Sequence, residues 1–234
     1  MEKRKIGSSD LEVAPLGLGG NVFGWTADER ASFAILDAFV DAGGTMIDTA
    51  DVYSTWVPGH RGGESETVIG RWLQRDPSKR DKIVIATKVG FTAGLAPETI
   101  GLSCEASLHR LGIETIDLYY HHKDDLSVPL VDSLRAMDAL VKEGKVRAVG
   151  LSQYSPERLE EAMRTVEQSG LTRPCALQTW YNMDERGKLE GALRDCALAN
   201  RRGVIPFYGL ANGFLTGKYR SEADLGQSAR GSGV

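Results

Sequence analysis

Short apolar runs alternate with amphipathic stretches along most of the chain. Each run is followed by a polar or glycine-containing break, and the runs recur at roughly thirty residues, the length of a strand–helix–strand unit. Alternating strands and helices at this spacing predict a parallel α/β sheet. The seven runs begin near Leu16, Thr45, Ile83, Ile116, Val146, Ala176 and Val204.

The stretches between the runs carry helix signals. Ser155 is a candidate N-cap, because Pro156 directly after it suits the first turn of a helix. Leu189, Leu193 and Cys196 have the spacing of the buried stripe of a later helix. Another buried face is predicted for Leu130, Leu134, Met137 and Val141.

The two ends of the chain differ from this repeat. Residues Arg4–Gly7 and Leu11–Val13 flank Ser8-Ser9-Asp10, which predicts an N-terminal β-hairpin. The last residues, 226–234, are rich in glycine and serine and have no helix or strand period. Because eight strand–helix units close a barrel of about 250 residues, we expect seven parallel strands in barrel order and no eighth unit. No linker or composition shift divides residues 1–234, so we expect a single domain.

Composition and charge exclude several classes of protein. The net charge of −4 and the isoelectric point near 5.7 disfavour general attraction to nucleic acid or to anionic membranes. No apolar run is long enough to span a bilayer. The charged N-terminus has no apolar stretch after it, so we expect no secretory signal and a cytoplasmic location. The three cysteines are too far apart for a zinc site or a disulfide framework.

Reactive side chains stand where the predicted strands end. Asp48 closes the second strand, Tyr53 follows it, Lys88 closes the third strand and His122 closes the fourth. The functional groups of parallel barrels gather at these carboxyl ends. We therefore expect the four side chains to converge.

Together these groups suit proton donation to a carbonyl. A phenol has a pKa near 10, and a neighbouring ammonium lowers it. A carboxylate holds the lysine charged, and a neutral imidazole can orient the carbonyl oxygen. No side chain supplies hydride, so this chemistry requires a nicotinamide cofactor.

A metal site is the rival interpretation of His121 and His122, with Asp124 and Asp125 close by. Adjacent residues of a strand point to opposite faces, so the two histidines do not readily bind one ion. We expect no metal, with His122 facing inward and His121 packed outside the barrel.

Three tryptophans lie in segments that follow predicted strands. They are either loop packing or the wall of an aromatic pocket that favours apolar carbonyl substrates. These residues are Trp25, Trp56 and Trp180.

Six motifs resemble the aldo-keto reductase superfamily, and they occur in the order found there. They are residues 44–53 (GTMIDTADVY), 63–66 (GESE), 86–88 (ATK), 116–122 (IDLYYHH), 149–152 (VGLS) and 213–219 (GFLTGKY). The resemblance implies a (β/α)8 TIM barrel, here without its C-terminal eighth unit. It also implies carbonyl reduction by NADPH, with NADH possible and no metal. On this basis Tyr53 is the general acid, Asp48 and Lys88 tune it, and His122 orients the substrate.

The resemblance also assigns residues to the cofactor. Gln178 and Ser152 match the side chains that hold the nicotinamide carboxamide, and Phe207 matches a ring that stacks on it. Lys218 either meets the cofactor phosphates or is an ordinary surface charge. The other matching positions are Gly19, Asn21, Gln153 and Leu210.

Two departures from the family pattern leave alternatives open. Gln153 stands where the family usually has asparagine, and the longer side chain either still reaches the carboxamide or shifts the cofactor. The segment that grips the adenosine and its 2′-phosphate would lie beyond Val234. The alternatives to a reductase are therefore a catalytically weak cofactor-binding module, resembling potassium-channel β subunits, and a non-functional fragment.

Overall fold

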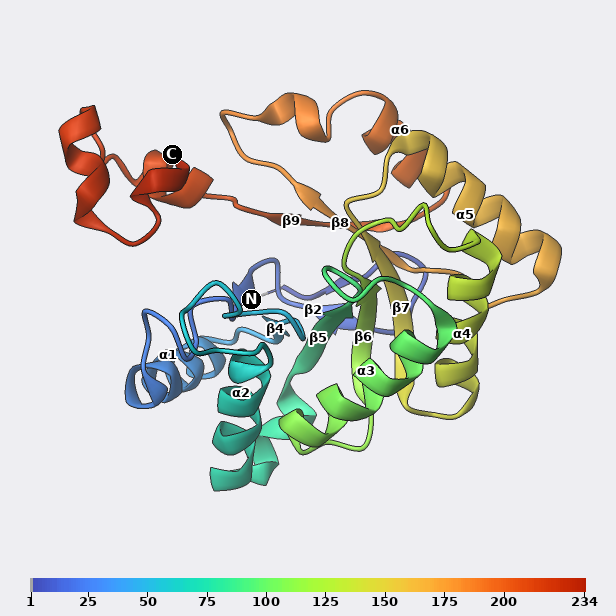
Figure 1. Cartoon of the computed structure of the whole chain (residues 1–234), viewed down its shortest axis with the longest axis horizontal. Helices are drawn as coiled ribbons and strands as arrows, with labels where there is room; N and C mark the ends of the chain where they lie inside the picture. The colour runs from blue at the N-terminus through green and yellow to red at the C-terminus, as the bar shows by residue number, and fades with distance from the viewer. Residues whose placement is uncertain (1) are drawn as a thin grey trace.

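The computed structural model describes residues 2–234, in which seven parallel strands form one sheet in chain order (Figure 1). This order confirms the predicted α/β architecture. The strands are β3 (Gly17–Gly19), β4 (Met46–Asp48), β5 (Val84–Val89), β6 (Ile116–His121), β7 (Val146–Ser152), β8 (Ala176–Trp180) and β9 (Gly203–Phe207). The helices between them are α1 (Glu29–Asp41), α2 (Glu64–Arg75), α3 (Pro97–Leu111), α4 (Leu130–Lys142), α5 (Pro156–Ser169) and α6 (Ala192–Ala199).

The sheet is an open, curled half-barrel. β3 and β9 are its two edges, and within residues 2–234 no further strand joins them. The central strands β5 and β6 are buried along their whole length, because helices cover one face and the barrel interior covers the other. Side chains such as Trp72 and Ile85 fill the outer layer between sheet and helices.

The predicted N-terminal hairpin is present. β1 (Arg4–Lys5) pairs antiparallel with β2 (Glu12–Val13), and Ile6 and Leu11 pack against the barrel interior with Leu118. Gly7 makes this fit possible, because a Cβ there would lie 2.1 Å from the carbonyl oxygen of Cys175. The hairpin therefore lies against the strands from the side of their amino ends.

The helix signals hold at one helix and fail in part at another. Ser155 caps α5 as predicted, since its hydroxyl accepts a hydrogen bond from the Arg158 amide. The predicted stripe through Leu189, however, does not belong to a single helix. α6 begins only at Ala192, because Gly191 adopts φ 98° and ψ −134° and interrupts the helical backbone. Leu189 is nonetheless buried, at the end of the short 3₁₀ turn η2 (Arg186–Lys188).

The chain after β9 contains only short 3₁₀ turns, which agrees with the predicted loss of helix and strand periods. These turns are η3 (Ala211–Thr216), η4 (Glu222–Gln227) and η5 (Gly231–Gly233), and a similar turn, η1 (Pro77–Lys82), precedes β5. The segment is tied to itself, as the Asn212 side-chain amide donates to the Gly233 carbonyl at 2.7 Å. It projects past β9 at one end of the molecule (Figure 1, red).

No helix within residues 2–234 has the length and apolar character that a membrane crossing requires.

Candidate active site

A cavity of about 1280 Å³ opens at the carboxyl ends of the strands and continues along the free edges of the sheet to the hairpin. Asp48, Tyr53 and His122 all line it. It is also lined by every residue that the sequence assigned to the cofactor, namely Gly19, Asn21, Ser152, Gln153, Gln178, Phe207, Leu210 and Lys218. The tryptophans divide: Trp56 and Trp180 line the cavity, whereas Trp25 does not.

Lys88 connects the acid candidate to its carboxylate. The lysine is completely buried, and its Nζ donates to Asp48 Oδ2 at 2.6 Å and to the Tyr53 hydroxyl at 2.9 Å. A third bond, to the Thr49 carbonyl at 2.7 Å, completes the coordination of the ammonium. Asp48 and Ala86 are register partners on adjacent strands. Lys88 lies two residues after Ala86, so it points to the same face of the sheet as Asp48.

The pKa of Tyr53 is shifted upward, whereas the neighbouring ammonium alone would lower it. Burial raises the pKa of Tyr53 to about 12, while the Lys88 charge opposes that rise and the Asp48 charge adds to it. Burial disfavours the charged form of Lys88, but Asp48 and Tyr53 outweigh burial and raise its pKa overall. At neutral pH the site therefore contains a protonated phenol beside an ammonium, the state that a proton donor needs.

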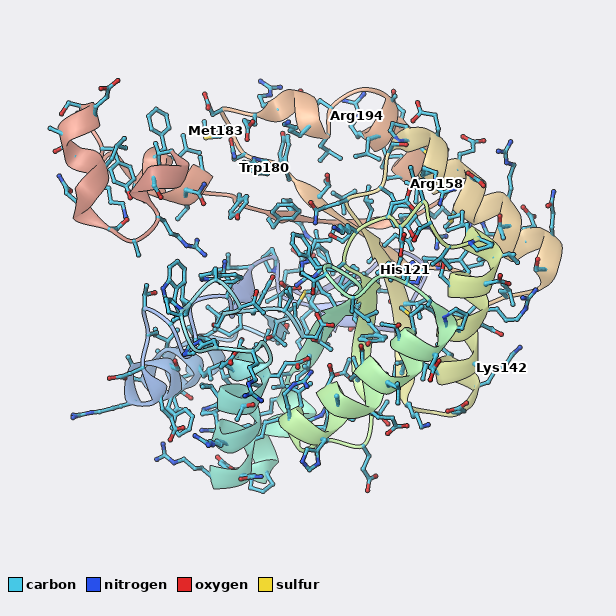
Figure 2. The ribbon with its side chains drawn as sticks, viewed as in Figure 1. His121, Lys142, Arg158, Trp180, Met183 and Arg194 are labelled. Carbon is cyan, nitrogen blue, oxygen red and sulfur yellow. The ribbon has the colours of Figure 1, made fainter. Side chains whose placement is uncertain are left out.

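His122 and His121 point apart, as the alternation of a strand predicts. Burial, together with the charges of Lys88 and Lys123, lowers the pKa of His122 to about 2, so its imidazole is neutral. Its ring centre lies 5.9 Å from that of Tyr53. His121 is buried on the other side, where its Nδ1 lies 2.9 Å from the Tyr154 hydroxyl; Figure 2 shows it among the sheet and helices.

The carboxylates that follow the histidines are engaged elsewhere. Asp124 forms a two-bond ion pair with Arg158, at 2.7 and 2.9 Å. Asp125 accepts from the backbone amides of Leu95 and Ser127. Across residues 2–234, no three His, Cys, Asp or Glu side chains are grouped so as to hold a metal ion.

A buried polar network lies behind the site, and its contacts were not foreseen from sequence. Glu66 is fully buried, accepts from the Thr87 hydroxyl and pairs with Arg110 at 2.7 Å. Asp51 lies near it, with Oδ1 buried and without a hydrogen-bond partner. Burial and the Glu66 charge raise the pKa of Asp51 to about 7. The GESE motif contains Glu66, but only the fold brings it to Thr87 and Asp51.

Aromatic rings form the walls of the cavity. Trp56 packs on Tyr53 at 6.2 Å between ring centres, and Trp25 meets Trp56 in an edge-to-face contact at 5.5 Å. Phe91, which was not predicted from the sequence, packs against His122 with the two rings tilted by 53° and their centres 4.8 Å apart. Its position two residues after β5 was the available signal. Trp180 projects from the end of β8 (Figure 2).

The cavity has the donor set that a nicotinamide dinucleotide needs. The Ser152 hydroxyl is buried in it without a partner, and the Gln178 amide donates to Asp48 Oδ1 at 2.9 Å. A Cβ at Gly19 would meet no atom within 4 Å, so the backbone there borders open space. Lys218 and Arg230 supply positive charge elsewhere on the lining. A neutral amide and negatively charged phosphates would both find partners here.

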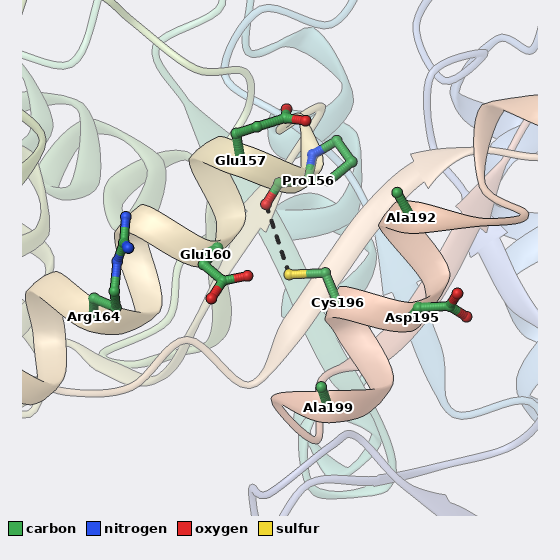
Figure 3. Close-up of a pocket in the computed structure, with 8 residues that line it drawn as sticks. All are labelled: Pro156, Glu157, Glu160, Arg164, Ala192, Asp195, Cys196 and Ala199. Atoms are coloured by element: carbon green, nitrogen blue, oxygen red, sulfur yellow. Dashed lines mark hydrogen bonds between the residues drawn. The ribbon is translucent and has the colours of Figure 1, made fainter.

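A second hollow, of about 550 Å³, lies between α5 and α6 and contains no residue of this site (Figure 3). The Cys196 thiol lies in it and donates to the Pro156 carbonyl at 3.6 Å. Burial raises the pKa of Cys196, so the thiol is not an activated nucleophile. The chemistry of the molecule is therefore concentrated in the first cavity.

The sequence of the chain is similar to those of several known proteins. The chain is 36% identical over 228 residues to the aldo-keto reductase str7 of Strobilurus tenacellus, covering 94% of this chain and 62% of the relative. It is 33% identical to the L-glyceraldehyde 3-phosphate reductase of Escherichia coli K12, covering 94% and 64%. It is 32% identical to a probable voltage-gated potassium channel subunit beta of Arabidopsis thaliana, covering 95% and 68%. The chain thus spans about two thirds of the length of each of these relatives.

The match to the family as a whole covers nearly the entire chain and includes every residue of the candidate site. The model of the Aldo/keto reductase family matches residues 15–232. The chain therefore belongs to the aldo/keto reductase family.

Proposed function

We propose that this protein reduces aldehydes or ketones to alcohols with NAD(P)H, and that Tyr53 is the proton donor. The observation that carries the proposal is the buried Lys88 ammonium, which bonds both the Tyr53 hydroxyl at 2.9 Å and the Asp48 carboxylate at 2.6 Å. Few purposes other than proton transfer require a buried ammonium beside a phenol at the wall of a cavity.

The residues divide the work of carbonyl reduction. Neutral His122 donates a hydrogen bond that orients the carbonyl oxygen beside Tyr53. As the carbonyl carbon becomes an alcohol carbon, Tyr53 transfers its proton to the oxygen. The phenolate left behind is stabilised by Lys88, and Asp48 keeps that ammonium charged and in place.

The hydride comes from the nicotinamide of the bound cofactor. Ser152 and Gln178 would hold its carboxamide, and Phe207 would stack on the ring. Gly19 and Asn21 would lie beside it, while Leu210 and Lys218 would contact the phosphate region. The unpartnered Ser152 hydroxyl supports this assignment, because a buried donor without a partner is costly unless a ligand satisfies it.

The aromatic wall supports an apolar small-molecule carbonyl as the substrate. Tyr53 and Phe91 pack against His122, and Trp56 packs against Tyr53. Such walls favour flat or apolar groups next to the reacting carbonyl. A relative named for L-glyceraldehyde 3-phosphate makes a small phosphorylated aldehyde the first polar compound to compare.

The second candidate is a cofactor-binding module with little turnover, for which the 32% identity to a potassium channel β subunit is the specific observation. Quenching of protein fluorescence by NADPH tests binding, and NADPH oxidation with a panel of aldehydes tests turnover. A reductase gives both signals. Binding without oxidation across the panel supports the module, and the absence of both signals refutes both functions.

A further inference from the structure

The turn after β7 fixes the end of β6. Gln153 donates from its side-chain Nε2 to the His122 carbonyl oxygen at 3.0 Å. The next residue, Tyr154, is buried and places its hydroxyl 2.9 Å from His121 Nδ1. Two consecutive residues of this turn therefore hold two consecutive histidines.

The backbone of Gln153 is itself fixed in an uncommon conformation. Its φ is +56°, in the left-handed region that asparagine and glycine enter more readily than glutamine. Its N–H donates to the Gln178 carbonyl at 3.0 Å, which ties the turn to β8. Strained backbone of this kind persists where the surrounding structure holds it, and it concentrates at functional sites.

The ring of His122 depends on this backbone anchor. Its Nδ1 is buried and has no hydrogen-bond partner, so no side chain holds the imidazole through that nitrogen. The residue is held by two hydrogen bonds of its backbone. Its N–H donates to the Val89 carbonyl oxygen at 2.8 Å, and its own carbonyl oxygen accepts from Gln153 Nε2 at 3.0 Å. Phe91 and Tyr53 pack against the imidazole, with ring centres 4.8 and 5.9 Å away.

The same hydrogen bond engages the amide that the family resemblance assigns to the cofactor. Gln153 Nε2 bonds the backbone carbonyl of His122, whereas the buried Ser152 hydroxyl is unpartnered. Gln178 also lines the cavity, and its side-chain amide bonds a residue of the site itself, Asp48, at 2.9 Å. We infer that Gln153 is a positioning residue for His122, and that Ser152 and Gln178 hold the nicotinamide carboxamide without it. This inference rests on the proposed carbonyl reduction.

The Gln153→Met variant tests the inference, because methionine keeps the length of the side chain and removes the amide. We expect the Kd for NADPH, measured by fluorescence quenching, to stay within about twofold of wild type. We expect kcat at saturating NADPH to fall by about 10- to 100-fold, the scale of a misplaced orienting group. Gln168→Met, at an exposed position near the end of α5, is the matched control and should change neither quantity.

A cofactor-free measurement reads the same contact directly. The imidazole NMR signals of His122 should move in Gln153→Met, while those of His60 and His109 stay in place. Gln153→Asn provides a folded variant if methionine is not tolerated, since asparagine suits the left-handed backbone but is one methylene shorter. It should reproduce the loss of kcat and the shift of the His122 signals.

Two results would overturn the inference. One is a Kd for NADPH that rises tenfold or more in Gln153→Met with kcat unchanged, because Gln153 would then be a cofactor ligand. The other is Gln153→Asn with wild-type kcat and unmoved His122 signals. Failure of the proposed function looks different: wild-type protein would then oxidise no NADPH, while the NMR comparison would still show whether Gln153 positions His122.

Discussion

Tyr53 is kept protonated by its surroundings, which makes its hydroxyl the most specific target for a test. We expect Tyr53→Phe to lower kcat by about 10²–10⁴-fold, the usual contribution of general acid catalysis. The Kd for NADPH should stay nearly unchanged, because in the proposed mechanism the hydroxyl donates a proton and does not hold the dinucleotide. Steady-state oxidation of NADPH with a reactive aldehyde measures the first quantity, and fluorescence titration measures the second. Turnover at the wild-type rate would remove Tyr53 from the mechanism.

In the proposed mechanism, Lys88 acts on Tyr53 through its charge as well as its position. The Lys88→Met variant lacks the ammonium that limits the rise in the pKa of Tyr53 caused by burial. It also leaves Asp48 without its buried ion-pair partner. We expect loss of reductase activity that a modest decrease in pH does not restore, because the missing group is the charge that stabilises the phenolate. Circular dichroism of the same preparation shows whether the fold is intact. Recovery of activity in mildly acidic buffer would contradict this role.

Asp51 should make the folded state less stable as the pH rises. Its pKa is about 7 in the folded chain against an ordinary value of 3.8, because burial and then the Glu66 charge raise it more than Arg110 and Lys88 lower it. Well below pH 4 the carboxyl is protonated in both folded and unfolded chains. Between pH 4 and 7 the unfolded chain releases this proton first, so stability falls through that window.

The variant Asp51→Asn cannot titrate and should lack this loss. Between pH 4 and pH 8, wild type should lose up to about 4 kcal/mol more of its free energy of unfolding than the variant does. This is the equivalent of a shift of three pKa units. Urea denaturation at the two pH values measures the difference. Identical pH profiles for the two proteins would show that Asp51 ionises normally in the folded chain.

At the scale of elements, Asp117 joins three strands near their amino ends. It is almost fully buried in β6, accepts from the Ile85 amide of β5 at 2.8 Å, and pairs with Arg147 of β7 and with Arg80, each at 2.8 Å. We expect Asp117→Ala to lower the free energy of unfolding by about 3 kcal/mol, because it leaves a buried amide and two cations without their acceptor. Chemical denaturation measures this loss.

The matched control for that variant is an ion pair on the surface. Asp132 pairs with Arg135 one helical turn away at 2.9 Å, and both side chains are exposed. Asp132→Ala should cost less than about 1 kcal/mol. Equal losses in the two variants would mean that burial does not strengthen the Asp117 network.

Sequence patterns predicted the elements well where one period dominates. The apolar runs placed all seven parallel strands. The central strands β5 and β6 gave the clearest runs, because strands buried on both faces read as continuous hydrophobic segments. The pattern failed around Leu189, where an apolar spacing continued across Gly191 although the helix did not. The spacing of apolar residues indicates which residues are buried. A single residue with a non-helical backbone conformation can end a helix while its neighbours stay buried.

The candidate site was predicted from sequence as a set of residues but not as an electrostatic state. The motifs predicted that Asp48, Tyr53 and Lys88 lie close together, and hydrogen bonds from the Lys88 ammonium do join the three side chains. The direction of the Tyr53 pKa could not be predicted, because burial competes with charge and depends on the whole enclosure. The hydrogen bond from Gln153 to His122 could not be predicted from the sequence either, since it depends on a left-handed backbone conformation after β7.

At the scale of the whole molecule, the open sheet should show uneven protection from solvent. β6 lies at the centre with neighbours on both sides, whereas β3 and β9 each have one edge that no other strand of residues 2–234 pairs with. We expect the Tyr119 amide to exchange hydrogen only through global unfolding, and the Val204 amide to exchange nearly as fast as in an unstructured chain. Hydrogen exchange followed by NMR resolves the two. Similar protection at both amides would show that another part of the protein covers the edge.

Pro206 has a consequence for how copies of this chain behave at high concentration. Gly203 donates to Cys175 and Phe207 accepts from Tyr181, so the alternate residues Val204 and Pro206 direct their backbone groups away from β8. Exposed strand edges act as templates for aggregation, and proline on an edge removes a donor that an incoming strand would need. In β9 that leaves Val204 as the outward backbone donor. The free edge of β9 is therefore a poor template for strand addition, and the protein should resist edge-to-edge aggregation through β9 despite its open sheet.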